Sequence, residues 1–253
     1  MYAEERQQAI VERARTEGRV DVADLAEEFG LTTETIRRDM SVLERHGLLR
    51  RVHGGAIPVE RLGFEPGLAD RDEVRTAEKE RIAKAALAEL PAEGAVLLDA
   101  GTTTARMAEA WPAERELTVV TNSVPIAGSL VTRPRTTVLI VGGKVRGRTM
   151  ASVEDWALRS LADTRVDVAF VGTNGLTAGH GLSTPDSSEA AVKRAMIAAA
   201  RRVVVLADHT KIGTDCLVRF GTLSEVDVLV TDNGLDADTA RHLETEGPKV
   251  IRA

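Results

Sequence analysis

TTETIRRDMSVLERHGLLRRVHGG, residues 32–55, is the stretch of sequence that decides how the rest of the chain is interpreted. Its apolar residues Ile36, Met40 and Leu43 recur at intervals of four and three, which is the apolar stripe of a helix lying on a small core. Gly47 follows four residues later and is placed to end the helix. The pattern therefore predicts a helix that ends just before this glycine.

This helix, residues 32–46, carries its polar residues on the opposite face, and a short basic strand follows it. A hydroxyl from Thr32 or Thr33 can cap the helix, because it satisfies a backbone N–H that has no partner in the first turn. Residues 48–53, LLRRVH, read as an apolar and basic strand, and Gly54-Gly55 reads as a turn. A helix with paired arginines followed by a basic hairpin is what a winged helix-turn-helix requires. The outward face of the helix holds Thr33, Glu34, Arg37, Arg38 and Arg45.

Two further helices precede this stretch and complete the motif. Residues 3–17 form the first predicted helix and residues 22–29 the second, which Asp21 can cap. Gly30-Leu31 supplies a short turn into the third helix, so the three make a helix-turn-helix. A generic three-helix bundle with solvated arginines fits the same spacing, because helix-turn-helix patterns also arise by chance.

The total charge argues weakly against nucleic-acid binding, but the distribution of charge does not. The whole chain carries a net charge of −6. Residues 1–30 hold four basic and eight acidic groups, whereas residues 31–61 hold six basic and four acidic groups. Phosphate binding depends on where the positive groups lie. We therefore expect the acidic first helices to face away from DNA and the non-specific affinity to be modest.

Length and composition indicate a soluble protein with one small and one medium domain. The 253 residues include no apolar run long enough to span a membrane and no signal-peptide core. The one cysteine, Cys216, excludes an intramolecular disulfide and a cysteine-based zinc site. A cytoplasmic protein without a membrane partner is the expectation.

The sequence pattern changes after residue 58. Proline, glycine and alternating charges interrupt residues 59–75, which predicts a linker, and a helix resumes over residues 76–90. The predicted domains are therefore residues 1–58 and residues 76–253. In the second domain β-branched runs alternate with helical stretches, which predicts an α/β fold with a mostly parallel sheet covered on both faces. The predicted strands are 95–98, 117–120, 137–141, 166–171, 203–206 and 226–230, and the predicted helices are 103–111, 123–131, 152–162, 187–201 and 236–246.

Ligands of open α/β sheets bind beyond the carboxyl ends of the strands, and the first of these ends reads as an anion site. Asp99 is followed by Gly101 and then by Thr102, Thr103 and Thr104 at the start of a predicted helix. The glycine lets backbone N–H groups turn towards a ligand, the hydroxyls add donors, and the helix dipole favours negative charge. Helix capping with a turn needs one threonine and not three, so the segment favours phosphate binding.

The other strand ends also carry polar residues, and each has a structural alternative. Hydroxyl and amide groups after the second strand can bind sugar hydroxyls or simply cap a helix. The glycines and cations after the third strand can complete an anion site or form a solvated turn. Glu189 and Lys193 lie four residues apart, which usually means a surface salt bridge, yet they lie near a strand-end loop. The remaining candidates are Thr121, Asn122, Ser123, Gly142, Gly143, Lys144, Arg146, Arg148, Asn174, Asp208 and Lys211.

These segments resemble one known family over nearly the whole chain, the bacterial transcriptional regulators of the DeoR type. The most specific part is residues 35–55, TIRRDMSVLERHGLLRRVHGG. Met40 stands where leucine is more usual, and Asp155 stands where glycine is expected, which leaves the structure of that loop open. The sensor domain of the family is matched in turn by residues 99–104, 121–123, 142–143, 189–193 and 208–211.

The resemblance implies a sensor fold related to ribose-5-phosphate isomerase, which binds a sugar phosphate and relays its occupancy to the DNA-binding domain. It also implies a homodimer or homotetramer on double-stranded operator DNA, and the sequence holds no motif for a cofactor or a metal. By analogy with the family, the effector-binding residues are Asp99, Gly101, Thr102, Thr103, Thr104, Thr121, Asn122, Ser123, Gly142, Gly143, Arg146, Asn174, Glu189, Lys193, Asp208 and Lys211.

The expected function is repression of a carbohydrate-utilisation operon, relieved by a phosphorylated sugar. The chain looks like the subgroup that regulates phosphotransferase-imported sugars, so fructose 1-phosphate is the expected effector. The helix over residues 32–46 enters the major groove, where Arg37 and Arg38 contact base edges or phosphates, and an arginine can pair with guanine. The wing contacts the DNA backbone or the minor groove. The predicted DNA-binding residues are Thr33, Thr35, Arg37, Arg38, Arg45, Arg50, Arg51 and His53.

Two rival functions fit parts of the sequence. A sugar-phosphate isomerase with an appended helical domain would share the sheet, but residues 167–175, DVAFVGTNG, lack the acidic DGAD loop of ribose-5-phosphate isomerase. His180 and His209 are isolated in sequence, which is typical of structural histidines and does not favour acid–base catalysis. A metabolite-binding scaffold whose helical domain binds protein is the third hypothesis.

Overall fold

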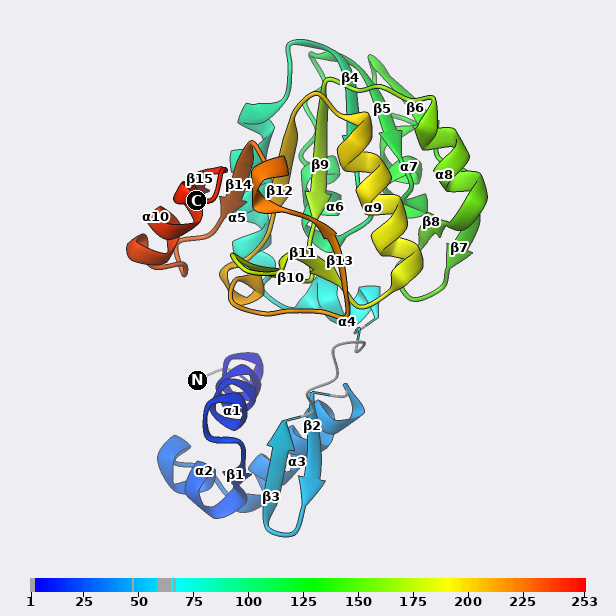
Figure 1. Ribbon diagram of the computed structural model, residues 1–253. Coiled ribbons are helices and arrows are strands. Elements are labelled where there is room, and N and C mark those ends of the chain that lie inside the picture. The colour runs from blue at the N-terminus through cyan, green and yellow to red at the C-terminus, as the bar shows by residue number, and fades with distance from the viewer. Residues whose placement is uncertain (1–2, 47, 59–64, 66) are drawn as a thin grey trace. The chain divides into compact units, whose positions relative to one another are not determined.

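The protein consists of two compact units, residues 1–66 and 67–253, and the computed structural model describes residues 3–46, 48–58, 65 and 67–253 (Figure 1). The predicted helix end at Gly47, and residues 59–64 and 66 of the predicted linker, lie outside the described residues. Within the described part of the chain, no helix has the length and apolar character needed to cross a membrane.

The N-terminal unit has the predicted winged helix-turn-helix architecture. Asp21 caps the second helix, since its Oδ1 accepts a hydrogen bond of 3.0 Å from the N–H of Ala23. Thr32, and not Thr33, caps the third, since its Oγ1 accepts from the N–H of Thr35 at 3.3 Å. The elements are α1 (Ala3–Glu17), β1 (Val20–Asp21), α2 (Val22–Phe29), α3 (Thr33–Arg45), β2 (Leu49–Val52) and β3 (Gly55–Pro58), with β3 in the centre of the antiparallel sheet.

A buried ion pair joins α1 to α3 beneath the apolar stripe. Ile36, Met40 and Leu43 are buried as predicted, and Asp39 is buried with them. Its Oδ2 accepts from Arg6 Nε at 2.6 Å, and its Oδ1 accepts from the Gln7 amide at 2.9 Å. Because both atoms of the carboxylate are engaged, the pair fixes the rotation of α3 about its own axis.

The C-terminal unit is built on a seven-stranded sheet with the order β15-β14-β12-β9-β4-β5-β6, and every neighbouring pair is parallel. The chain runs from β4 outward through β5 and β6, then returns to β9 on the other side of β4. Strands β4 and β9 therefore flank the point where the strand order reverses, which is where open α/β sheets bind ligands. The seven strands are β4 (Glu93–Leu98), β5 (Glu116–Thr121), β6 (Thr136–Ile140), β9 (Val168–Gly172), β12 (Val203–Leu206), β14 (Val228–Thr231) and β15 (Lys249–Arg252).

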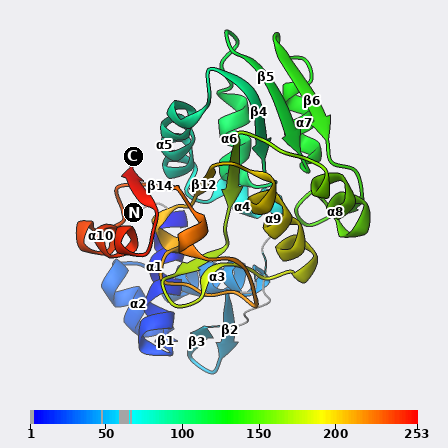
Figure 2. The same cartoon turned by 45° about the horizontal axis from the view of Figure 1, so that its top comes forward.

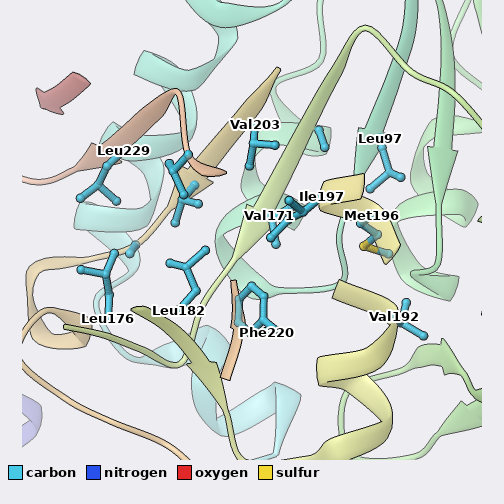
Figure 3. Packing of buried hydrophobic residues seen from close by; sticks show 14 of the residues in the cluster. Leu97, Val171, Leu176, Leu182, Val192, Met196, Ile197, Val203, Phe220 and Leu229 are labelled. Atoms are coloured by element: carbon cyan, nitrogen blue, oxygen red, sulfur yellow. The ribbon is translucent and has the colours of Figure 1, made fainter. Parts of the chain in front are cut away.

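Helices cover both faces of this sheet, because successive residues of each strand point to opposite sides. Val96 and Leu98 belong to an apolar cluster with residues of α5, α6 and α7, whereas Leu97 belongs to a second cluster with residues of α8, α9 and α10. Figure 3 shows Leu97, Val171 and Val203 of the strands gathered around Ile197 of α9. The helices are α4 (Leu68–Glu73), α5 (Thr76–Ala86), α6 (Thr102–Glu109), α7 (Val124–Leu130), α8 (Glu154–Ala162), α9 (Ser187–Ala199) and α10 (Ala237–Thr245), with short 3₁₀ turns at Leu87–Glu89, His209–Lys211 and Leu223–Glu225.

The structure adds elements that the sequence pattern did not predict. Helix α4 lies inside the range expected to be linker, and the helix expected over 76–90 ends at Ala86. The added strands are short or lie at an edge, so they carry too few residues for a clear periodic pattern. They are β7 (Lys144–Arg146) paired with β8 (Ala151–Val153), the small sheet of β10 (Gly175–Thr177), β11 (Gly181–Thr184) and β13 (Val218–Gly221), and the edge strand β15.

Replacing Asp39 with alanine is expected to destabilise the N-terminal unit by about 3–5 kcal/mol, because it leaves the Arg6 guanidinium buried without a counter-ion. The matched control is Asp238→Ala, whose side chain is 85% exposed in an ion pair with Arg241 and is expected to cost less than about 1 kcal/mol. Urea unfolding of the full chain, with hydrogen exchange followed over α3, measures both. Equal stability of the two variants would contradict the role given to the buried pair.

Candidate functional site

The exposed face of α3 and the wing presents the predicted basic residues to solvent. All of the predicted DNA-binding residues are exposed except Thr35, which is half-buried. The Thr35 hydroxyl lies 2.9 Å from the hydroxyl of Thr32, so it belongs to the helix cap. Arg38 and Arg50 make no recorded hydrogen bond or ion pair within the described part of the chain, which leaves their guanidinium groups available for a phosphate or a base edge.

The wing is held in a fixed position against α3. The N–H of Arg51 donates to Glu44 Oε1 at 3.1 Å, and Arg51 Nη1 donates to the Ser41 hydroxyl at 3.1 Å. At the tip of the wing, Arg19 Nη2 donates to the carbonyl of His53 at 3.1 Å. These bonds mean that the helix and the wing present their basic groups as one surface.

In the C-terminal unit, Asp99 and Lys193 meet at the reversal point of the sheet. The carboxylate follows β4, and the ammonium, from α9, donates to its Oδ2 and to the Gly172 carbonyl of β9 at 2.9 Å. The N–H of Gly172 donates to the same carboxylate oxygen at 3.0 Å. Burial raises the pKa of the Asp99 carboxyl, and the Lys193 charge acts in the opposite direction. This arrangement ties the ends of β4 and β9 to the middle of α9.

A second cluster of charges lies between the β7–β8 hairpin and the start of α9. Arg146 and the Thr149 hydroxyl both donate to Glu189 Oε1, and Arg146 Nη2 lies 3.2 Å from Asp186. Glu189 also acts electrostatically on Asp99, so the two clusters are neighbours. Glu189 and Lys193 thus each pair with a residue from another part of the chain, and the simple surface salt bridge suggested by their spacing is wrong.

Of the three threonines at the start of α6, one uses its hydroxyl in hydrogen bonds within the protein and two do not. Thr104 is buried and donates to the carbonyls of Asp99 at 2.7 Å and Gly101 at 3.0 Å. Thr102 and Thr103 are also buried, but their hydroxyls make no recorded hydrogen bond within the described residues. The first backbone N–H groups of a helix have no intrahelical partner, so this end of α6 retains several donors.

The polar residues that follow β5 are engaged in internal hydrogen bonds. The Thr121 hydroxyl donates to the Leu98 carbonyl at 2.7 Å, and Ser123 Oγ caps α7. The Asn122 side chain accepts from the N–H of Ala100 at 3.0 Å and donates to the Ser152 carbonyl at 3.2 Å. These side chains therefore shape the loop that precedes α6, and their polar atoms reach a ligand only if these bonds change.

A third group of charges follows β12. Asp208 accepts from the hydroxyl and the N–H of Thr210, and Lys211 Nζ lies 4.0 Å away. Burial alone would raise the pKa of the Asp208 carboxyl, but Lys211, Thr210 and Lys79 outweigh it and lower that pKa below its ordinary value. Asp208 is therefore an ionised hydrogen-bond acceptor at neutral pH.

The remaining predicted residues have mainly structural surroundings. A Cβ on Gly143 would meet the Val153 carbonyl at 2.7 Å, so this glycine permits the close approach of the hairpin. Lys144 is exposed and pairs with Glu154 at 2.8 Å. Asn174 Oδ1 accepts from the Thr184 hydroxyl at 3.0 Å. Gly142 follows β6, and Asp155 lies in the first turn of α8.

Sequence reasoning missed Lys79 and the pairing of His209 with Asp232. Lys79 is buried on α5, and burial lowers its pKa to about 8, opposed chiefly by the charge of Asp208. Its spacing was a usable signal, because a lysine on the same helical stripe as Ile82, Ala83 and Ala86 must point inward. His209 Nδ1 lies 2.8 Å from Asp232 Oδ1, and these residues follow different strands, so no local sequence pattern connects them.

Comparison with known proteins agrees with both units. Residues 6–61 match the family described as the DeoR-like helix-turn-helix domain, and residues 74–233 match the DeoR C terminal sensor domain. The HTH-type transcriptional regulator GlpR of Haloferax volcanii is 37% identical over 251 residues, covering 99% of this chain and 98% of that protein. The chain belongs to the DeoR family of transcriptional regulators.

Further relatives of this DeoR-family protein are also regulators. The glycerol-3-phosphate regulon repressor of Escherichia coli K12 is 31% identical, and the match covers 92% of each chain. Family membership makes the protein a transcriptional regulator and not an enzyme, which removes the isomerase hypothesis. Among solved structures, ribose 5 phosphate isomerase A from Neisseria gonorrhoeae aligns with a TM-score of 0.41 and 15% identity, over 57% of this chain and 55% of that one.

Proposed function

We propose that this protein represses a carbohydrate-utilisation operon and is released from its operator by a phosphorylated sugar. The observation that carries the proposal is the start of α6, where the hydroxyls of Thr102 and Thr103 and the first-turn N–H groups have no recorded partner among the described residues. Neither hydroxyl oxygen is among the fully buried polar atoms that lack a partner, so both can be reached by a ligand, and a phosphoryl group can accept hydrogen bonds from several such donors at once. A helix N-terminus also favours the negative charge of that group.

The sugar part of the effector is assigned to the neighbouring strand ends. Asp99 and Lys193 hold the ends of β4 and β9, and the ionised Asp208 offers an acceptor for hydroxyl groups. The cations nearby are already paired with carboxylates, so a free anion gains less there than at the helix end. Fructose 1-phosphate is the proposed effector, and glycerol 3-phosphate is the second candidate because one relative bears the name of that regulon.

The effector assignment predicts that fructose 1-phosphate raises the melting temperature of the full chain, whereas fructose does not. At about 100-fold excess over Kd, mass action gives about 2.7 kcal/mol of stabilisation. Thr102→Val with Thr103→Val removes two donors and should reduce the shift strongly, whereas Thr118→Val on β5 should not. Scanning fluorimetry with fructose 1-phosphate, glycerol 3-phosphate and inorganic phosphate measures this. No shift with any phosphorylated compound would sink the assignment.

The DNA-binding assignment predicts sequence-selective retention of duplex DNA through α3. A wild-type protein incubated with a randomised duplex library should enrich one operator sequence, and Arg37→Ala with Arg38→Ala should lose that enrichment. Each bidentate arginine–guanine contact is worth about 1–3 kcal/mol of discrimination. The control is Arg241→Ala, an exposed arginine of α10. Equal enrichment of the same sequence by both variants would refute the role given to Arg37 and Arg38, and no enrichment by the wild type would support the scaffold hypothesis.

A homo-oligomer formed through β6 completes the proposal. In the described part of the chain no strand pairs with the outer edge of β6, and Leu139 and Ile140 on it are 53% and 55% exposed. Trp156, beside the adjoining open pocket at Gly143 and Lys144, is 70% exposed. Lys144 and Glu154 place both signs of charge next to this surface, so a second copy related by a two-fold axis meets complementary charges.

Changing Leu139→Glu together with Ile140→Lys is expected to convert the oligomer to a monomer, because an edge strand with inward charges cannot pair with a second copy. Size-exclusion chromatography with light scattering reports the mass. Leu217→Glu, at an exposed leucine outside this surface, is the control and should leave the mass unchanged. A monomeric wild type, or an unchanged mass in the double variant, would refute the β6 interface.

A further inference from the structure

Helix α4 is the first helix of the C-terminal unit, and polar contacts rather than apolar packing hold it in position. It is six residues long, Leu68–Glu73, and none of its residues is buried. A helix this short does not hold its place by helix propensity, and without buried side chains it does not hold it by apolar packing. Its position in the unit therefore depends on polar contacts.

These polar contacts join α4 to the β7–β8 hairpin, to α6 and, through Lys79, to the charged residues after β12. At its start, the N–H of Leu68 donates at 2.9 Å to the carbonyl of Arg148, in the hairpin that carries Arg146 and Thr149. In the middle, Asp72 Oδ2 lies 2.9 Å from Arg106 Nη2, on the helix that Thr102 and Thr103 begin. Figures 1 and 2 show α4 at the end of the sheet toward which the strands run.

The end of α4 is held by Lys79 of α5. Its ammonium donates to the carbonyl of Arg71 and, at 2.6 Å, to that of Val74. The same ammonium interacts with the charges of Asp208 and Lys211 after β12. Between the two helices Arg75 has a φ of 58°, a left-handed conformation that is unfavourable for a residue with a side chain. The Lys79 ammonium thus stabilises the turn between α4 and α5 and also interacts with the charged residues that follow β12.

We propose that α4 is the element through which effector occupancy is read, and that Lys79 is its positioning residue. The proposal rests on the proposed effector site. When the sugar part of the ligand lies beside Asp208 and its phosphoryl group lies at the start of α6, the added negative charge attracts the Lys79 ammonium and weakens its bonds to the two carbonyls. The other two contacts of α4 are made to Arg106 of the helix that Thr102 begins and to the hairpin that carries Arg146, so movement of either segment on ligand binding also acts on α4. Because α4 is the first described helix of the unit after the boundary with residues 1–66, its release reaches the chain that leads to the DNA-binding unit.

Hydrogen exchange over residues 68–75 of the full chain tests this directly. Without ligand, Lys79→Met keeps the aliphatic length of the side chain but removes the donor, and it should raise exchange there at least tenfold. Leu68→Pro is a second variant, which removes the N–H that donates to the Arg148 carbonyl along with the half-buried leucine side chain. Proline is tolerated at the first position of a helix, so the helix itself can form, and this variant should act in the same direction. Lys84→Met, at an exposed lysine of the same helix, is the control and should not.

Addition of fructose 1-phosphate gives the second half of the test. In the wild type the ligand should raise exchange over residues 68–75, and in Lys79→Met it should add no further increase while still raising the melting temperature. Unchanged exchange in both ligand-free variants overturns the proposal. A melting shift in the wild type with unchanged exchange over 68–75 overturns the α4 proposal alone, whereas no melting shift with any phosphorylated sugar overturns the effector site on which it rests.

Discussion

The ion pair between Asp99 and Lys193 is the constraint on which the sensor unit depends. Its side chains are 1% and 6% exposed, and it ties the ends of β4 and β9 to α9 where the strand order reverses. A buried ion pair is a weak source of stability, because desolvation of two charges offsets much of their attraction. Its presence there is better explained by position: it joins the ends of β4 and β9 to α9 at the edge of the sheet where the strand order reverses.

The same constraint explains why the neighbouring polar residues have such different roles. Once Asp99 is fixed, the loop to α6 must follow a set path, and Asn122 and Thr104 hold that path through bonds to backbone groups. The polar atoms of these two side chains therefore already have hydrogen-bond partners within the protein. The hydroxyls of Thr102 and Thr103 are not needed for that purpose, which is why they remain candidates for direct contact with a phosphoryl group.

Periodicity predicted the large elements, and strand-end reasoning predicted which polar residues follow the strands, but neither predicted the partner of each polar atom. The stripe of Ile36, Met40 and Leu43 and the β-branched runs are local signals, and the structure has the helices and strands they imply. The partner of Glu189 is an arginine more than forty residues away, and His209 meets an aspartate from another strand end. Such pairings follow from the strand order, which a single sequence does not encode in any local pattern. Lys79 was the exception, since its place on an apolar stripe was readable.

The free energy with which single contacts hold α4 in place suits a regulatory element better than a structural one. A single hydrogen bond contributes about 0.5–1.5 kcal/mol net, and bonds to charged groups contribute roughly 1.5–3. The loss of one or two such contacts therefore changes the free energy by an amount on the order of the roughly 1–3 kcal/mol that couples two sites in a typical allosteric protein. A helix buried in the apolar core would cost far more to displace than one small ligand can supply. Linkage also requires the reverse effect: if release of α4 lowers DNA affinity, then operator binding must lower effector affinity by the same factor.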